Sequence, residues 1–175
     1  LAVRGHNHKL GESGVAFFAA ASLKLAQGNF PRCLDDAPLL VPGHGAAVRG
    51  QIDLWLNEER LTPRIMGEFD DGALMKAFGQ AGAGYFPAPV LLADEICTRY
   101  EVEMVGQVDS IRETFWLITT ERRISHPAMR TVVEAGHGRS AAKLRSYLRA
   151  AYALAQRARL DATAPAALLA LGIET

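Results

Sequence analysis

The sequence predicts an α/β fold built around parallel strands, and two observations carry that prediction. Residues 64–90 read as a short apolar strand, an amphipathic helix and a second strand that ends in prolines. Residues 15–21 and 37–41 are continuously or almost continuously apolar, as expected of strands buried on both faces of a sheet. Strands joined by a helix cannot form a tight hairpin, so we expect parallel neighbours with right-handed crossovers.

Segment 64–90 contains signals for the start and the end of each of its elements. Residues 64–69 are rich in large apolar side chains and predict a half-buried strand. Asp70 and Asp71 then offer side-chain oxygens to the first free N–H groups of a helix. The apolar residues of that helix recur on one face, which we expect to be buried: Leu74, Met75, Phe78 and Ala81. Glycines at 82 and 84 end the helix, and prolines at 87 and 89 end the next strand.

The other elements follow from the same kinds of signal. Helices are expected at 22–28, 46–61, 91–100, 125–136 and 141–160, and further strands at 102–108 and 112–120. The helix at 46–61 has a predicted inner face of Val48, Ile52, Trp55 and Leu56. The helix at 141–160 is rich in alanine and arginine, so it either contacts a membrane or partner or packs, solvated, on its own domain; we favour the second interpretation.

A tight glycine turn, Pro42-Gly43-His44-Gly45, precedes the helix at 46–61. Free N–H groups and a partial positive charge at a helix start can bind an anion. Neither GxGxxG nor GxxxxGKS/T occurs here, so ordinary strand-to-helix turn chemistry is the simpler interpretation. His44 is the one histidine whose position beside a turn singles it out, but no catalytic spacing accompanies it, and we predict no enzyme.

Composition limits the classes of protein that need to be considered. Of the 175 residues 49% are apolar, and 19 basic residues balance 19 acidic ones, which is typical of a soluble globular protein without a nucleic-acid-binding surface over its whole length. Cys33 and Cys97 lie far apart and favour reduced thiols. His6 and His8 would share one face of a strand, but no cysteine or carboxylate cluster is near enough in sequence to complete a metal site. No signal peptide or membrane-spanning run is present, and we predict no cofactor and no membrane partner.

Four segments carry a resemblance to a known family. They are the text at 10–26 that begins LGESGVAFFAAAS, DDAPLLVPG at 35–43, IDLWLNEERLTPRIMGEFDDGALMKAFGQAGAGYFPAPV at 52–90, and ERRISHP at 121–127. Together they cover about residues 1–136, and they resemble the effector-binding (substrate-binding) domain of LysR-type transcriptional regulators. Within that family the chain is most similar to the branch that activates sodium/proton antiporter genes.

The resemblance implies a periplasmic-binding-protein-like type II fold, with one complete Rossmann-like subdomain and part of a second. Residues 22–113 would form subdomain II, the effector-binding lobe, and residues 1–21 and 114–138 would belong to subdomain I. The basic helical segment 139–175 does not match the family. The resemblance also implies a helix-turn-helix upstream of Leu1, so that DNA is bound only through that missing part, by a dimer or tetramer in the cytoplasm.

Such domains bind a small effector or ion at the carboxyl ends of their strands. Carried onto this sequence, the expected effector-binding residues are Ala20, Gly43, His44, Gly45, Phe69, Asp70, Asp71, Phe86, Pro87 and Thr114. Glu68, Asp70 and Asp71 are weak candidates for a cation such as sodium, because hard cations prefer oxygen ligands. An aspartate before a helix is first of all a cap, however. A transport-type solute-binding protein of the same architecture is the alternative function.

Overall fold

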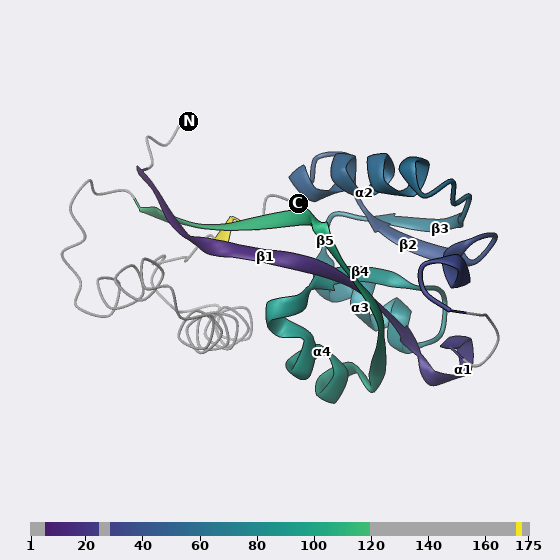
Figure 1. Cartoon of the computed structure of the whole chain (residues 1–175). Coiled ribbons are helices and arrows are strands. Elements are labelled where there is room, and N and C mark those ends of the chain that lie inside the picture. The colour runs from purple at the N-terminus through teal and green to yellow at the C-terminus, as the bar shows by residue number, and fades with distance from the viewer. Residues whose placement is uncertain (1–5, 25–28, 120–170, 173–175) are drawn as a thin grey trace. The chain divides into compact units, whose positions relative to one another are not determined.

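The computed structural model describes residues 6–24, 29–119 and 171–172, and the chain divides into two compact units. Ser13–Glu113 forms one unit, and the segments Leu1–Glu12 and Thr114–Ile173 form the other. Strands β1 (His6–Ala20) and β5 (Val102–Thr119) each run through a boundary between the units. Within residues 6–119, as far as they are described, the chain therefore passes between the units twice, both times within a strand (Figure 1). The resemblance places the start of the same lobe at residue 22.

The unit Ser13–Glu113 contains most of the described helices and strands. Its helical elements are α1 (Ala21–Lys24), η1 (Arg32–Leu34), α2 (Ala47–Glu58), α3 (Gly72–Gln80), η2 (Val90–Leu92) and α4 (Ala93–Tyr100). Its remaining strands are β2 (Pro38–Pro42), β3 (Arg64–Phe69) and β4 (Phe86–Pro89). In the other unit, β6 (Leu171–Gly172) pairs antiparallel with β5. The helices predicted at 125–136 and 141–160, and residues 25–28 of the helix predicted at 22–28, lie outside the described residues.

Parallel pairing holds where the sequence predicts it, around β2. β2 and β3 pair in parallel from Pro38↔Arg64 to Pro42↔Phe69, with an irregularity between Leu39 and Leu40. On its other side β2 bonds to Tyr85, again in parallel, through Leu40 N–H to Tyr85 O and Tyr85 N–H to Pro38 O, each 2.8 Å. Helix α2 thus connects β2 to its parallel neighbour β3, and helix α3 connects β3 to the segment around Tyr85, the parallel neighbour on the other side of β2.

The pairing of β4 with β1 differs from the prediction that neighbouring strands are parallel. The two strands run antiparallel, with Val15 opposite Pro89 and Phe18 opposite Phe86. Prolines 87 and 89 lie within β4 rather than after it. In the sheet order β4-β1-β5-β6, β1 lies between β4 and β5. No helix connects β1 directly to β4, so the rule that favours parallel pairing of helix-connected strands does not apply to this pair.

Strand β1 divides the hydrophobic core into two halves, because its side chains alternate between the faces of the sheet. Val15, Phe17 and Ala19 join the half that contains Ile52 and Trp55 of α2. Ala16 and Phe18 join the half that contains Met75 of α3, with Phe86, Ile96 and Tyr100. Figure 1 shows α2 on one side of the strands and α3 and α4 on the other. The prediction that residues 15–21 form a strand buried on both faces is confirmed from Val15 to Ala20.

Three further predictions about elements are wrong in detail. Segments 102–108 and 112–120 are one strand, β5, which lies beside β1 in the sheet and continues through the exposed residues Asp109 and Ser110. On α3 the buried residues are Met75 and Gly79, whereas Leu74 is 51% and Phe78 47% exposed. β3 is mostly exposed rather than half buried, since among the described residues it pairs only with β2.

Candidate functional site

Two loops meet at the carboxyl ends of β2 and β3, as the predicted parallel pairing requires. The first, Gly43 to Gly45, leads from β2 into α2, and the second, Asp70 and Asp71, leads from β3 into α3. The Gly43 N–H donates to the carbonyl of Phe69 over 2.9 Å, which joins the two loops directly. The structure therefore brings together the expected residues 43–45 and 68–71 at one edge of the sheet.

Gly43 is buried, and the Asp70 side chain occupies the space that a larger residue would need. A Cβ at position 43 would lie 2.2 Å from Asp70 Oδ1. Asp70 is exposed, and its carboxylate accepts none of the hydrogen bonds formed among the described residues. The glycine in the turn thus lets an acidic side chain lie over the end of β2.

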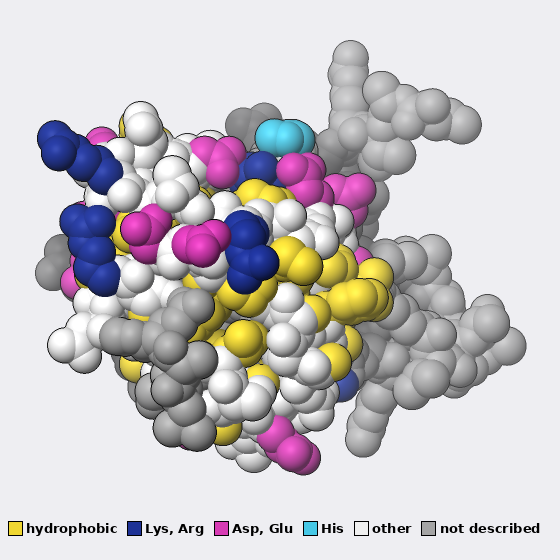
Figure 2. Space-filling model, turned by 90° about the vertical axis from the view of Figure 1, so that its right-hand side faces the viewer, with side chains coloured by type: hydrophobic (Ala, Val, Ile, Leu, Met, Phe, Trp, Pro, Cys, Tyr) yellow, Lys and Arg dark blue, Asp and Glu magenta, His cyan; other side chains and the backbone are white. Residues whose placement is uncertain are grey.

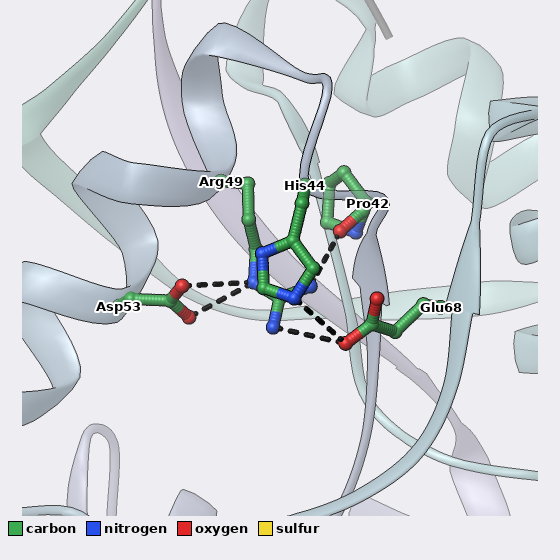
Figure 3. A network of polar contacts seen from close by, with 5 residues as sticks. All are labelled: Pro42, His44, Arg49, Asp53 and Glu68. Atoms are coloured by element: carbon green, nitrogen blue, oxygen red, sulfur yellow. Dashed lines mark hydrogen bonds and ion pairs between the residues drawn. The ribbon is translucent and has the colours of Figure 1, made fainter.

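Arg49, in the first turns of α2, lies at the centre of a polar network (Figure 3). Its Nε donates to both carboxylate oxygens of Asp53 at 3.0 Å, its Nη1 donates to Pro42 O at 2.8 Å, and its Nη2 donates to Glu68 Oε1 at 3.2 Å. Burial alone would disfavour the charged guanidinium, but the hydrogen bonds to Asp53 and Glu68 outweigh it and raise the pKa of Arg49. Arg49 is 7% exposed, whereas the side chains of Asp53 and Glu68 are 46% and 43% exposed, so water is excluded from these bonds mainly on the arginine side.

His44 shares the Glu68 carboxylate with Arg49. Its Nε2 lies 3.5 Å from Glu68 Oε1, an ion pair only when the imidazole is protonated. The His44 side chain is 75% exposed, which leaves the ring accessible to a ligand. Figure 2 shows one face of the molecule on which a histidine and charged side chains of both signs lie next to hydrophobic side chains.

Asp71 caps α3, as the sequence predicts. Its Oδ1 accepts from the backbone N–H of Ala73 at 2.7 Å and of Leu74 at 3.3 Å. These bonds satisfy two of the free donors at the helix start. The Asp71 carboxylate therefore points into its own helix.

Replacing Asp71 by alanine is expected to lower the free energy of unfolding by about 0.5–2 kcal/mol, because the cap is lost. The neighbouring Asp70→Ala is the matched control and should change stability by less than about 0.5 kcal/mol, since Asp70 makes no capping bond. Urea unfolding followed by circular dichroism measures both variants. Equal losses in the two would contradict the assignment of the cap to Asp71.

The other expected site residues lie elsewhere. Phe86 is fully buried, with its ring 5.6 Å from that of Phe18, and Pro87 is buried in the antiparallel pairing with β1. Both lie at the start of β4, and Phe86 belongs to the hydrophobic core. Ala20 is the last residue of β1, and Thr114 lies on β5 in the other unit.

The three carboxylates considered for a cation face different partners. Glu68 contacts Arg49 and His44, Asp71 caps α3, and Asp70 lies over Gly43. In the part of the chain that the structure describes, no three His, Cys, Asp or Glu side chains converge where a metal ion could bind. Both cysteines are free, and burial raises the pKa of each thiol.

Sequence reasoning missed Arg49 and Asp53. The predicted inner face of α2 contained only apolar residues, and no role was predicted for Arg49 or Asp53. Two signals were available: Arg49 and Asp53 are spaced i,i+4, where opposite charges on a helix meet, and Arg49 follows the glycine turn by one helical turn.

A family model described as the LysR substrate binding domain matches residues 4–140. The chain belongs to this family. It is 36% identical over 124 residues to the transcriptional activator protein NhaR of Escherichia coli strain K12, and equally to NhaR of Shigella flexneri. Each match covers 71% of this chain but 40% of the relative, so the chain spans less than half the length of these curated proteins.

Solved structures of LysR effector domains share the fold. The AmpR effector binding domain of Citrobacter freundii matches with a TM-score of 0.56 at 21% identity, over 76% of this chain and 68% of that one. The AmpR effector domain of Pseudomonas aeruginosa matches with a TM-score of 0.54 at 18% identity, over 90% of this chain and 69% of that one. The predicted periplasmic-binding-protein-like type II fold is confirmed, and the chain is a LysR effector-binding domain similar to NhaR.

The LysR family comprises transcriptional regulators rather than enzymes, in agreement with the absence of a catalytic spacing in the sequence. None of the helices in the described ranges is both long enough and apolar enough to cross a membrane.

Proposed function

We propose that this LysR domain senses a small effector, and that the effector contacts the carboxyl ends of β2 and β3. The observation that carries the proposal is the meeting of turn 43–45 with residues 68–71 at the end of a parallel strand pair. In open α/β sheets, ligands bind outside the carboxyl ends of the strands. The exposed His44 ring and the Asp70 carboxylate supply groups that can bind a polar ligand there.

Two classes of effector fit this edge of the sheet: a small polar molecule and a monovalent cation. The similarity to NhaR and the acidic residues at this edge favour testing sodium first. Glu68 and Asp71 already accept hydrogen bonds from Arg49 and from the start of α3, which argues against a cation bound by all three carboxylates. Asp70, with backbone carbonyls and water, would then be the main ligand.

The experiment is an NMR titration of the ¹⁵N-labelled chain. The probes are sodium, lithium and potassium chloride at constant ionic strength, and small mono- and dicarboxylates in parallel samples. A bound probe is expected to shift the amide signals of Gly43, Gly45 and Asp70 and to leave those of Glu58 and Arg60, at the far end of α2, unchanged. Shifts confined to residues outside 43–45 and 68–71 would place the effector elsewhere.

Replacing Gly43 by alanine is expected to weaken the response to the bound probe at least about tenfold. The new methyl group would lie 2.2 Å from Asp70 Oδ1, so the carboxylate must move. Asp70 is an exposed, flexible side chain, so the loss of stability should stay below about 1 kcal/mol. The same titration measures the first effect and urea unfolding the second. An unchanged titration would show that Asp70 and the turn do not take part in binding.

We further propose that the full-length protein is a transcriptional regulator that acts on a sodium/proton antiporter gene. It would bind DNA through a helix-turn-helix outside this chain, as a dimer or tetramer, in the cytoplasm. The similarity to a transcriptional activator supports this assignment over a transport-type solute-binding protein. Binding of the full-length protein to promoter DNA in a gel-shift assay, with and without sodium, tests it. A full-length protein with a secretion signal and no DNA binding would favour the transport function.

A further inference from the structure

The contacts of Arg49 extend beyond its own helix. Its guanidinium binds the Asp53 carboxylate of α2, the Pro42 carbonyl at the end of β2, and the Glu68 carboxylate near the end of β3. All three nitrogens of the guanidinium donate, and the residue is 7% exposed. A planar fork of five N–H donors can satisfy three acceptors in different directions at once, which an ammonium group cannot do in the same geometry.

We propose that Arg49 is a positioning residue for the proposed effector site, which consists of residues 43–45 and 68–71 at the carboxyl ends of β2 and β3. It ties the carboxyl ends of β2 and β3 to the start of α2, and so fixes the Gly43–Gly45 turn and the Glu68 carboxylate relative to each other. This inference rests on the proposed function for the role of that edge in binding. The tie itself is independent of what the effector is.

Glu68 connects the buried Arg49 to the exposed His44. Its Oε1 accepts from Arg49 Nη2 at 3.2 Å and lies 3.5 Å from His44 Nε2, so one oxygen links a buried cation to an accessible imidazole. Without Arg49, Glu68 loses its buried partner and the Pro42 carbonyl loses its donor. The turn is then held to β3 mainly by the 2.9 Å bond from Gly43 N–H to Phe69 O.

This arrangement predicts a local effect, which distinguishes positioning from a general contribution to stability. In Arg49→Met the amides of Gly43 and Ala46, which donate to Phe69 O and Gly43 O, should exchange with solvent faster. The Leu40 amide, which donates to Tyr85 O at 2.8 Å in the core, is the internal reference. Amides that open locally respond separately from those that open only by global unfolding.

The experiment measures amide hydrogen exchange by NMR in the whole chain and three variants. In Arg49→Met the ratio of the Gly43 rate to the Leu40 rate should rise about 10- to 100-fold, the loss expected for hydrogen bonds to charged groups. Arg49→Lys should give an intermediate ratio, since one ammonium can replace only part of the fork. Glu58→Gln, a surface change on the same helix, should leave the ratio unchanged.

Coupling with Glu68 provides a second readout. Adding Glu68→Gln to Arg49→Met should increase the ratio no further, because the contribution of Glu68 to holding the turn depends on its bond to Arg49, which is already lost. If the Gly43 and Leu40 rates rise by equal factors in Arg49→Met, or if the two changes add in full, Arg49 contributes only to global stability and the positioning role is wrong.

The same samples separate this inference from the proposed function. The wild-type chain and Arg49→Met are titrated with sodium, lithium and potassium chloride. If the amides of Gly43 and Asp70 respond in the wild type and the response is at least about tenfold weaker in Arg49→Met, both the positioning role and the proposed effector site are supported. A selective rise in the exchange ratio, with an unchanged titration in the variant, supports the tie and contradicts a role in binding. A wild-type chain that responds to no salt contradicts a cation effector, while the exchange ratio still decides the positioning role.

Discussion

Replacing Gly79 by alanine is expected to lower the free energy of unfolding by about 2 kcal/mol. Gly79 lies on the buried face of α3, and a Cβ there would be 2.1 Å and 2.4 Å from two ring carbons of Phe86. Phe86 is fully buried and its ring packs against Phe18, so it has no free space into which to move. The steric cost of such overpacking exceeds the gain of about 1 kcal/mol that alanine brings to a helix interior.

Gly50→Ala is the matched control for this prediction. Gly50 lies in the middle of α2 and is exposed, and a Cβ there meets nothing within 4 Å. Alanine should therefore raise the free energy of unfolding by about 0.5–1 kcal/mol through helix propensity alone. Urea unfolding of both variants gives the comparison. If both changes stabilise the chain, α3 does not approach β4 as closely as the structure has it.

Gly79 also explains why the buried face of α3 could not be predicted from apolar periodicity. Leu74 and Phe78 are strongly apolar and defined the predicted face, yet both are about half exposed. The residue that faces the sheet is a glycine, because only a position without a side chain allows the helix to approach Phe86 so closely. A hydrophobicity pattern gives no weight to a missing side chain.

The strands around β2 were predictable for a different reason. Their runs of apolar residues and their helix connections restrict them to parallel pairing, which the β2–β3 register and the bridge to Tyr85 bear out. The antiparallel contact of β1 with β4 involves residues about 70 positions apart in the sequence, such as Phe18 and Phe86, and no local signal records it. Long-range pairing of a strand that links the two units has to be read from the structure.

In the candidate site, too, contacts between neighbours in the sequence could be predicted, and the long-range contact of Arg49 with Glu68 could not. The Asp71 cap depends on neighbours along the chain, so the sequence was sufficient to predict it. The junction of Gly43 with Asp70 followed from the general position of loops at the ends of parallel strands. The role of Arg49 did not, because its acceptors lie on three elements and one of them, Glu68, is 19 residues away.

A second large effect is expected from Lys76 and Glu113, two half-buried residues of opposite charge on α3 and β5. Burial lowers the pKa of Lys76, and the charge of Glu113 offsets part of that shift. Asp71 also raises the pKa of Lys76, and Arg99 lowers it. Burial likewise raises the pKa of Glu113, and Lys76 offsets part of that shift. Each charge therefore makes the burial of the other less unfavourable.

These shifts fix the sign of the pH dependence. Above pH 4.5, the ordinary pKa of a glutamate side chain here, folded Glu113 binds more protons than the unfolded chain, so its contribution to stability falls as pH rises to its native pKa. Below pH 10.5 and down to the lowered native pKa of Lys76, the unfolded chain binds more protons, so the Lys76 contribution rises with pH.

Lys76→Met is therefore expected to change the pH profile at both ends. The loss of stability with rising pH that begins above pH 4.5 should extend to higher pH, because Glu113 has lost its compensating charge. The alkaline gain below pH 10.5 should disappear, because the lysine that produces it is gone. In the double variant Lys76→Met, Glu113→Gln both contributions should vanish, and the double variant should be more stable at neutral pH than Lys76→Met alone. Thermal unfolding between pH 4 and pH 10 measures all of these changes, and a Lys76→Met profile parallel to that of the wild type would show that the two charges are not coupled.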